Sequence, residues 1–137
     1  MGGSIYAIVT ITNTGSQSLW LNTRMLEGPA APVAVPTQEI WLDLRFKAQK
    51  LDFRCEYRTR PISKDDYRVL APGQSIDTEL EISVCHDLTD LGSYTLIAHY
   101  VDGQRNPPKA PDRAVHLKQE LVSQPVSFEV LGGRSKY

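Results

Sequence analysis

The sequence predicts an all-β fold, built as a sandwich of two antiparallel sheets. Apolar and polar residues alternate with a period of two through most of the chain, and helical periodicity is hard to find. Glycine and proline separate the alternating stretches at short intervals. With 137 residues, 41% of them hydrophobic, the chain is long and apolar enough for one core. We therefore expect a single domain over residues 1–137.

The first third of the chain predicts two strands and a long loop. Residues 5–12 are apolar and β-branched, as in a strand, and residues 19–21 centre a second strand. Between them, Asn13-Thr14-Gly15-Ser16 predicts a turn in which Gly15 takes a positive φ. Three prolines make residues 24–38 a loop, because proline removes a ladder donor. Residues 1–4 are expected to be a cloning remnant or a trimmed start.

Residues 40–46 and 51–57 predict a β-hairpin. Both alternate in polarity, and a four-residue connection would join them. Opposite charges then lie opposite each other, which supports this register by about 0.2–1 kcal/mol per pair. The expected cross-strand pairs are Phe46–Leu51, Arg45–Asp52, Leu44–Phe53, Asp43–Arg54 and Leu42–Cys55.

The middle of the chain predicts an edge fragment and a long strand. Residues 67–70 form a short apolar stretch, and Pro72-Gly73 fits a type II turn with glycine at the positive-φ position. Residues 76–84 then alternate as one long strand, with Ile82 and Val84 on its inner face. Its outer face is acidic and carries Asp77, Glu79 and Glu81.

A tyrosine after a turn opens the next strand, residues 94–102. The Tyr94 hydroxyl is expected to bond back to the backbone, as in the tyrosine corner of Greek-key sandwiches. Residues 103–120 contain three prolines and predict a second long loop. The last strand is expected over residues 121–131, where Pro125 indicates an edge position or a bulge. The inward residues would be Leu96, Ala98, Tyr100, Val126, Phe128 and Val130, and residues 132–137 would form a flexible tail.

Seven such strands predict a seven-stranded antiparallel immunoglobulin-like sandwich with a Greek-key crossover. Several turns and core positions form a recurring pattern: Thr12-Asn13-Thr14-Gly15, residues 69–75, Cys85-His86-Asp87-Leu88, residues 92–96 and residues 121–130. This pattern resembles that of bacterial immunoglobulin-like (fibronectin III-like) modules. Such modules occur as accessory domains of exported proteins and as propeptides of deuterolysin-type metalloproteases. The resemblance implies a bacterial protein that is periplasmic or secreted, and it carries no functional residue across.

Cys55 and Cys85 leave two interpretations open. Bonded to each other, they would close a loop of about 30 residues and stabilise the fold by about 3–4 kcal/mol. We favour two reduced, mostly buried thiols, because free cysteine is among the most buried residue types. A pair this sparse does not fix the redox compartment.

The composition and the polar residues predict a protein that is not an enzyme. A net charge of −1 argues against a nucleic-acid-binding stripe, and no apolar stretch is long enough to span a membrane. Cys85-His86-Asp87 is the densest group of metal donors, but adjacent residues point different ways, so we expect a polar turn. A protease-like arrangement of Cys85 with His99 or His116 is expected only by chance. We predict no catalytic residue, no metal and no cofactor.

Two surfaces are candidates for binding. On the outer face of the late strand, Ile97, His99 and Val101 join Trp41 of the neighbouring strand in one patch, unless a long loop folds over them. At one end of the sandwich, the connections 24–38, 58–73 and 103–120 emerge together, if residues 67–70 are an edge fragment. The candidate binding residues in the last of these loops are Arg105, Pro107, Pro108 and Arg113.

We therefore expect a non-catalytic interaction or accessory module that binds a protein through proline-rich loops. Mixed charges in the loops favour a protein partner over a nucleic acid, while floppy loops without a function remain the alternative. A protease inhibitor or propeptide-like regulator is a second hypothesis, because a proline-rich loop resists cleavage. Carbohydrate binding through Trp20 or Trp41 is a third.

Overall fold

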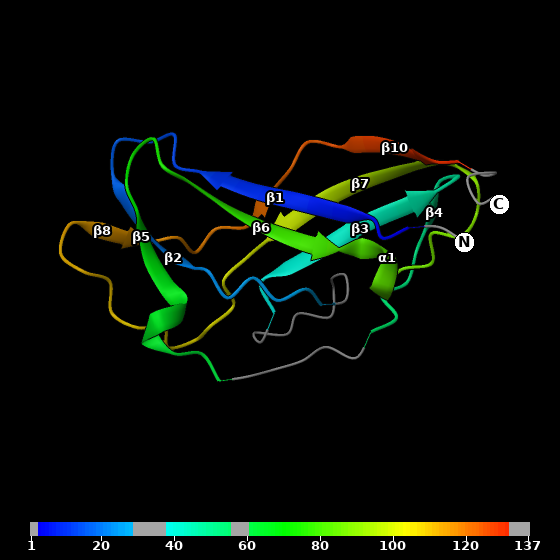
Figure 1. Ribbon diagram of the computed structural model, residues 1–137. Helices are drawn as coiled ribbons and strands as arrows, with labels where there is room; N and C mark the ends of the chain where they lie inside the picture. The colour runs from blue at the N-terminus through cyan, green and yellow to red at the C-terminus, as the bar shows by residue number, and fades with distance from the viewer. Residues whose placement is uncertain (1–2, 29–37, 56–60, 132–137) are drawn as a thin grey trace.

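The computed structural model describes residues 3–28, 38–55 and 61–131 and confirms that the protein is all-β (Figure 1). Two sheets form the body of the described part. In the first, β1 (Tyr6–Thr12) pairs with β6 (Ser75–Glu81). The second has the order β10-β7-β3-β4, with β9 also paired to β7. Its strands are β3 (Ile40–Phe46), β4 (Gln49–Lys50), β7 (Gly92–Tyr100), β9 (Leu121–Val122) and β10 (Val126–Val130).

A third sheet lies at one end of the molecule, at the left of Figure 1. It contains β5 (Tyr67–Leu70), β2 (Ser18–Asn22) and β8 (Ala114–His116) in that order. The short 3-10 helix η1 (Lys64–Asp66) leads into β5, which is an edge strand as predicted. Because β8 runs parallel to β2, residues 103–120 contain a strand and are not loop throughout.

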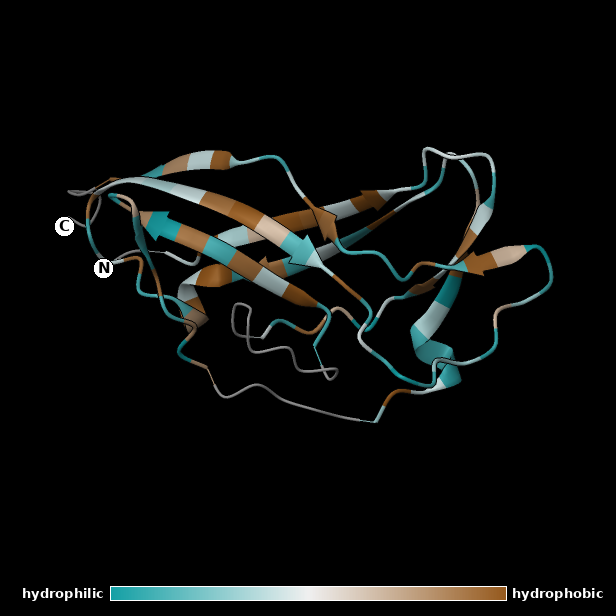
Figure 2. Ribbon diagram, turned by 180° about the vertical axis from the view of Figure 1, so that it is seen from behind, coloured by the Kyte–Doolittle hydropathy of each residue, from teal (hydrophilic) through white to brown (hydrophobic). Residues whose placement is uncertain are grey.

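The core lies between the alternating faces of these sheets. Apolar and polar residues alternate along the strands in Figure 2, as the period-two pattern predicts. The buried apolar cluster draws on all three sheets, with Ile11 from β1, Leu21 from β2, Leu44 from β3 and Leu96 from β7. One hydrophobic core therefore joins the third sheet to the other two.

Asn13 makes the connection between the first and the third sheet. Its Nδ2 donates to the carbonyls of Gln17 (2.8 Å) and Leu70 (2.9 Å), and its Oδ1 accepts from Gly15 N (3.0 Å). The predicted positive φ of Gly15 is wrong, because the Asn13 side chain makes the bend and β1 and β2 do not form a hairpin. On the facing segment, Gly73 has φ +83° and closes the predicted Pro72-Gly73 turn.

The predicted tyrosine hydrogen bond is confirmed. Tyr94 is buried, and its hydroxyl donates to the Asp90 carbonyl at 2.8 Å. Its ring lies between Phe46 and Phe128, with centroid distances of 4.7 and 5.3 Å. The start of β7 is therefore fixed both by a polar contact and by aromatic packing.

The predicted hairpin register is wrong. Lys47 and Ala48 adopt φ of 50° and 66°, so two residues make the turn and Phe46 lies opposite Gln49. Strand β4 ends at Lys50, and one further bond follows, from Leu51 N to the Leu44 carbonyl at 2.8 Å. The chain then turns toward Cys85, whose carbonyl accepts from Arg54 N. The expected charge pairs are replaced by Arg45–Asp43 within β3 and by Arg54–Asp87.

The long strand predicted over residues 76–84 ends early. β6 stops at Glu81, and the single helical turn α1 (Ile82–Cys85) follows. Ile5 anchors this change, because its carbonyl accepts from Ile82 N and its N–H donates to Ser83 Oγ. Ile82 is buried as predicted, but Val84 is 63% exposed.

The last strand is divided in two around Pro125, as the proline predicted. β9 and β10 both pair with β7, and β10 is an edge strand. Phe128 and Val130 pack against the core, as do Leu96, Ala98 and Tyr100 of β7. Val126 is 55% exposed, because it lies on the open edge, and its predicted inward position is wrong. Predictions for residues 1–2, 29–37, 56–60 and 132–137 lie outside the described residues.

Replacement of Tyr94 by phenylalanine tests the tyrosine hydrogen bond. Tyr94→Phe keeps the ring packing and removes only the donor to Asp90, so the free energy of unfolding should fall by about 1 kcal/mol. Urea denaturation measures it, with Tyr6→Phe at a 52% exposed position as the control. Equal stability of the two variants would contradict a stabilising tyrosine corner.

Candidate functional site

The segment after Asp102 forms an exposed loop that the third sheet holds in place. Of the predicted site residues in it, Arg105 and Arg113 are exposed, while Pro107 and Pro108 are half-buried. The Trp20 indole Nε1 donates to the Pro108 carbonyl at 2.9 Å. Beyond the prolines, β8 pairs with β2, and Leu117 N donates to the Trp20 carbonyl. The loop is therefore fixed in its middle and at its end.

Asp102 fixes the beginning of the same loop. Its Oδ2 accepts from the Tyr67 hydroxyl at 2.7 Å and from His116 Nε2 at 2.6 Å. Its Oδ1 accepts from Asn22 Nδ2 at 3.1 Å and from Gln104 N at 3.2 Å. One buried carboxylate thus joins β2, β5, β8 and the end of β7.

A buried ion pair extends this network. Arg24 Nη2 and Glu39 Oε2 are 2.6 Å apart, and their side chains are 1% and 0% exposed. Glu39 also accepts from Leu26 N and from Asn22 Nδ2, the amide that reaches Asp102. Removing either partner would leave an unpaired buried charge, which is costly. The pair therefore keeps Arg24 and Glu39 next to each other.

The network also shifts the pKa of its members. Burial acts to raise the pKa of Asp102, but hydrogen bonds from His116, Tyr67 and Asn22 outweigh it, and the pKa lies below the usual value. Burial and the neighbouring Asp102 carboxylate raise the pKa of Tyr67 and Tyr100. Asp102 is therefore a carboxylate at neutral pH, and both tyrosines are hydrogen-bond donors.

The Asp102–His116 pair joins the segment after β7 to β8. The second ring nitrogen of His116, Nδ1, is buried and has no hydrogen-bond partner among the described atoms. A catalytic pair would place a nucleophile there. The tyrosine that shares the carboxylate has a raised pKa, which makes it a poor nucleophile. The network around Asp102 can hold the loop in one position. It depends on four buried residues that were not predicted as site residues, Asn22, Arg24, Glu39 and Asp102.

Parts of the three connections that were expected to emerge together, 24–38, 58–73 and 103–120, lie at the third sheet. Residues 67–70 and 114–116 flank β2, so the second and third connections lie together. The first connection begins beside them, because Thr23 N and Thr23 Oγ1 both donate to the Asp66 carbonyl. Its residues 29–37 lie outside the described part.

The predicted patch on the outer face of β7 is brought together. Trp41 lies directly opposite His99, with ring centroids 3.6 Å apart and planes 9° from parallel. Glu120 Oε2 lies 2.9 Å from His99 Nδ1, and Val122 of β9 extends the row beside His99. Residues 121–122 thus form β9, which pairs with β7 next to the patch. The four predicted members, Trp41, Ile97, His99 and Val101, are all half-buried.

Trp20, one of the two tryptophans considered for carbohydrate binding, is buried. It is 6% exposed, it stacks on Tyr67 at 5.6 Å, and its N–H is used by Pro108. This burial disfavours a sugar stacked on Trp20, and carbohydrate binding stays a prediction that nothing here tests.

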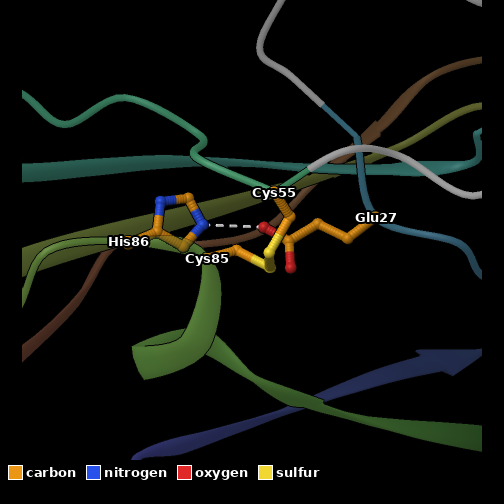
Figure 3. The surroundings of a disulfide bond; sticks show 4 residues. All are labelled: Glu27, Cys55, Cys85 and His86. Carbon is orange, nitrogen blue, oxygen red and sulfur yellow. Dashed lines mark hydrogen bonds and ion pairs between the residues drawn. A yellow bond between two sulfur atoms is a disulfide. The ribbon is translucent and has the colours of Figure 1, made fainter.

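Cys55 and Cys85 form a disulfide, so the reduced pair that we favoured is wrong (Figure 3). The bond ties the segment after β4 to α1. Next to it, His86 Nε2 lies 2.8 Å from Glu27 Oε2, and Asp87 bonds to Thr89 and Arg54. The three donors of Cys85-His86-Asp87 thus have separate partners, and Cys85 offers no thiolate. Within residues 3–28, 38–55 and 61–131, no group of His, Cys, Asp or Glu is arranged to hold a metal ion.

No protein-family model and no curated protein sequence matches this chain. In the part of the chain that the structure describes, no helix has the length and hydrophobicity needed to cross a membrane.

The buried carboxylate predicts a specific pH dependence. Because hydrogen bonding lowers the folded-state pKa of Asp102, its stabilisation is present at neutral pH and is lost as the pH falls below about 4. Asp102→Asn should cost about 2–3 kcal/mol at neutral pH, and this difference from wild type should shrink in acid. Urea unfolding at several pH values measures it, with the exposed Asp112→Asn as the control. A difference that stays constant with pH would contradict the charged role of Asp102.

The disulfide should contribute substantially to stability. It closes a loop with a sequence separation of 30, so Cys55→Ser with Cys85→Ser should lower the free energy of unfolding by about 3–4 kcal/mol. Thermal and urea denaturation of the oxidised wild type and of the double variant measure the loss. Reductant should destabilise the wild type alone. If the reductant lowers the stability of the wild type and of the double variant equally, or of neither, the disulfide does not stabilise the fold.

Proposed function

We propose that this chain is a non-catalytic protein-interaction or accessory module, and that residues 103–113 form its binding surface. One observation carries the proposal: an exposed, proline-rich loop is anchored to the core at its start, middle and end. The anchors are the Asp102 network, the Trp20–Pro108 hydrogen bond and the β2–β8 pairing.

Such anchoring favours binding, because a loop held in one conformation loses little entropy when a partner docks. Pro107, Pro108 and Pro111 restrict the backbone further.

The side chains that the loop presents favour a protein partner. Arg105, Lys109 and Arg113 are exposed, and none of them takes part in an ion pair among the described residues. Asp112 lies between them and is also exposed. Arginine is enriched in protein interfaces, and separated charges of both signs suit a protein surface better than a phosphate backbone.

The finer fold and the setting are part of the same proposal. We infer a seven-stranded immunoglobulin-like sandwich with a Greek-key crossover, which the Tyr94–Asp90 hydrogen bond supports. We infer also that the protein resembles bacterial modules of exported proteins. The Cys55–Cys85 disulfide fits an oxidising compartment such as the periplasm or the medium.

Capture by paired variants tests the binding loop. The immobilised protein is incubated with extract and medium of the cells that produce it, and retained proteins are quantified by mass spectrometry. Arg105→Ala with Lys109→Ala should reduce retention of the specific partner by more than about tenfold, because exposed loop cations are removed.

The matched control is Lys47→Ala with Lys50→Ala, which removes two exposed cations at the β3–β4 turn, away from the third sheet, and should retain the partner. Equal thermal midpoints show that all variants are folded. Equal retention by both pairs of variants would exclude the loop as the binding surface. If the retained partner is a protease whose activity falls on binding, the module acts as an inhibitor or propeptide-like regulator.

A further inference from the structure

β1 is an edge strand that carries no protection against further pairing. All seven residues, Tyr6–Thr12, are uncharged, and none is glycine or proline. Among the described strands it pairs with β6 alone (Figure 1). Long edge strands of β-branched and aromatic residues pair readily with another strand unless charge or proline prevents it.

The hydrogen-bond pattern leaves one set of backbone groups free for a new strand. Ile5 O accepts from Ile82 N, and Asn13 N donates to Gln74 O, so residues 5 and 13 both bond toward β6. Antiparallel ladders alternate, so the odd residues between them also bond toward β6. The N–H and C=O groups of Tyr6, Ile8, Thr10 and Thr12 therefore point to the outer edge.

The side chains at these positions are also accessible. Tyr6 is 52% exposed and Ile8 is 66% exposed, and both lie on the outer face of β1. Exposed apolar side chains on a free edge favour burial against another strand.

The other edge strands of the described part carry protection. Asp77, Glu79 and Glu81 lie along β6, and Arg68 lies in β5. β8 has only three residues, and β4 and β9 have two each. β10 follows Pro125 and contains Glu129. Charges, proline and short length are the usual means by which sheet edges avoid pairing, and β1 alone among these has none of them.

We propose that β1 pairs antiparallel with β1 of a second copy of this chain, about a two-fold axis at Val9. Tyr6 then lies opposite Thr12 of the second copy, and Ile8 lies opposite Thr10 of the second copy. This register brings the outward backbone groups of the even residues together and forms about eight hydrogen bonds. The result is a continuous sheet with the order β6-β1-β1-β6 and a symmetric interface.

Charge favours a second copy over a strand that carries acidic residues. An added strand lies two strand spacings, about 10 Å, from the acidic β6, so acidic residues on it would be repelled, weakly at physiological salt and more strongly at low salt. A second β1 brings no charge. The two β6 strands are separated by three strand spacings, about 14 Å, which exceeds the Debye length of about 8 Å at physiological salt.

Sedimentation equilibrium of the full chain over a range of protein concentrations tests the proposal. The mass should rise toward twice the monomer mass, equally at low and at high salt, because the interface is uncharged. Ile8→Pro removes an N–H that points to the free edge and leaves the β6 ladder intact, so it should weaken dimerisation by more than about tenfold. Ile8→Lys should do the same, and because the introduced lysine lies opposite Glu79, the monomer stays folded.

Leu91→Lys is the matched control, since it removes a 60% exposed apolar side chain outside the strands and should leave the mass unchanged. A wild type that stays monomeric at every concentration would overturn the proposal. So would a dimer that persists in folded Ile8→Lys, or one that dissociates in high salt, because each indicates another surface.

Discussion

The hydrogen bonds of the Asp102 carboxylate hold together the end of the molecule that contains the third sheet (β5, β2 and β8). The carboxylate is buried, and it accepts hydrogen bonds from Tyr67, His116, Asn22 and the Gln104 backbone. A buried carboxylate without such donors would cost several kcal/mol, so the segments that supply them are fixed relative to one another. Three strands that are distant in sequence thereby form one sheet.

This constraint gives the proline-rich loop its position. The loop leaves β7 at Asp102 and returns at His116, so the same carboxylate contacts both of its ends. Between them, Trp20 holds the Pro108 carbonyl while its ring stacks on Tyr67. The rigidity that the proposed binding surface requires thus comes from the core beneath the loop, and only part of it comes from the prolines. The dimer edge that we infer on β1 belongs to a different sheet.

The sequence predicted those features that depend on the polarity or type of single residues. Period-two alternation places Leu44 and Leu96 in the core, and a tyrosine after a turn predicts the Tyr94 hydrogen bond. The hairpin register was missed because Lys47 and Ala48 lack the glycine or asparagine typical of a two-residue turn. A shift of two residues also leaves every side chain on the same face, so alternation cannot detect it.

The exposed loop of the candidate site was predicted from the sequence, but the buried carboxylates that hold it were not. Pro108 and the neighbouring cations were identified from composition, but Glu39 and Asp102 were not, because a charged residue beside a loop is usually solvated. Their burial depends on partners far away in sequence.

Hydrogen exchange of the free protein tests most directly whether this network holds the loop before any partner binds. The account predicts that the amide of Leu117, which donates to the Trp20 carbonyl, exchanges as slowly as amides of the β3–β7 ladder in the wild type. Exchange of Leu117 at the rate of an unstructured chain, while that ladder remains protected, would contradict it.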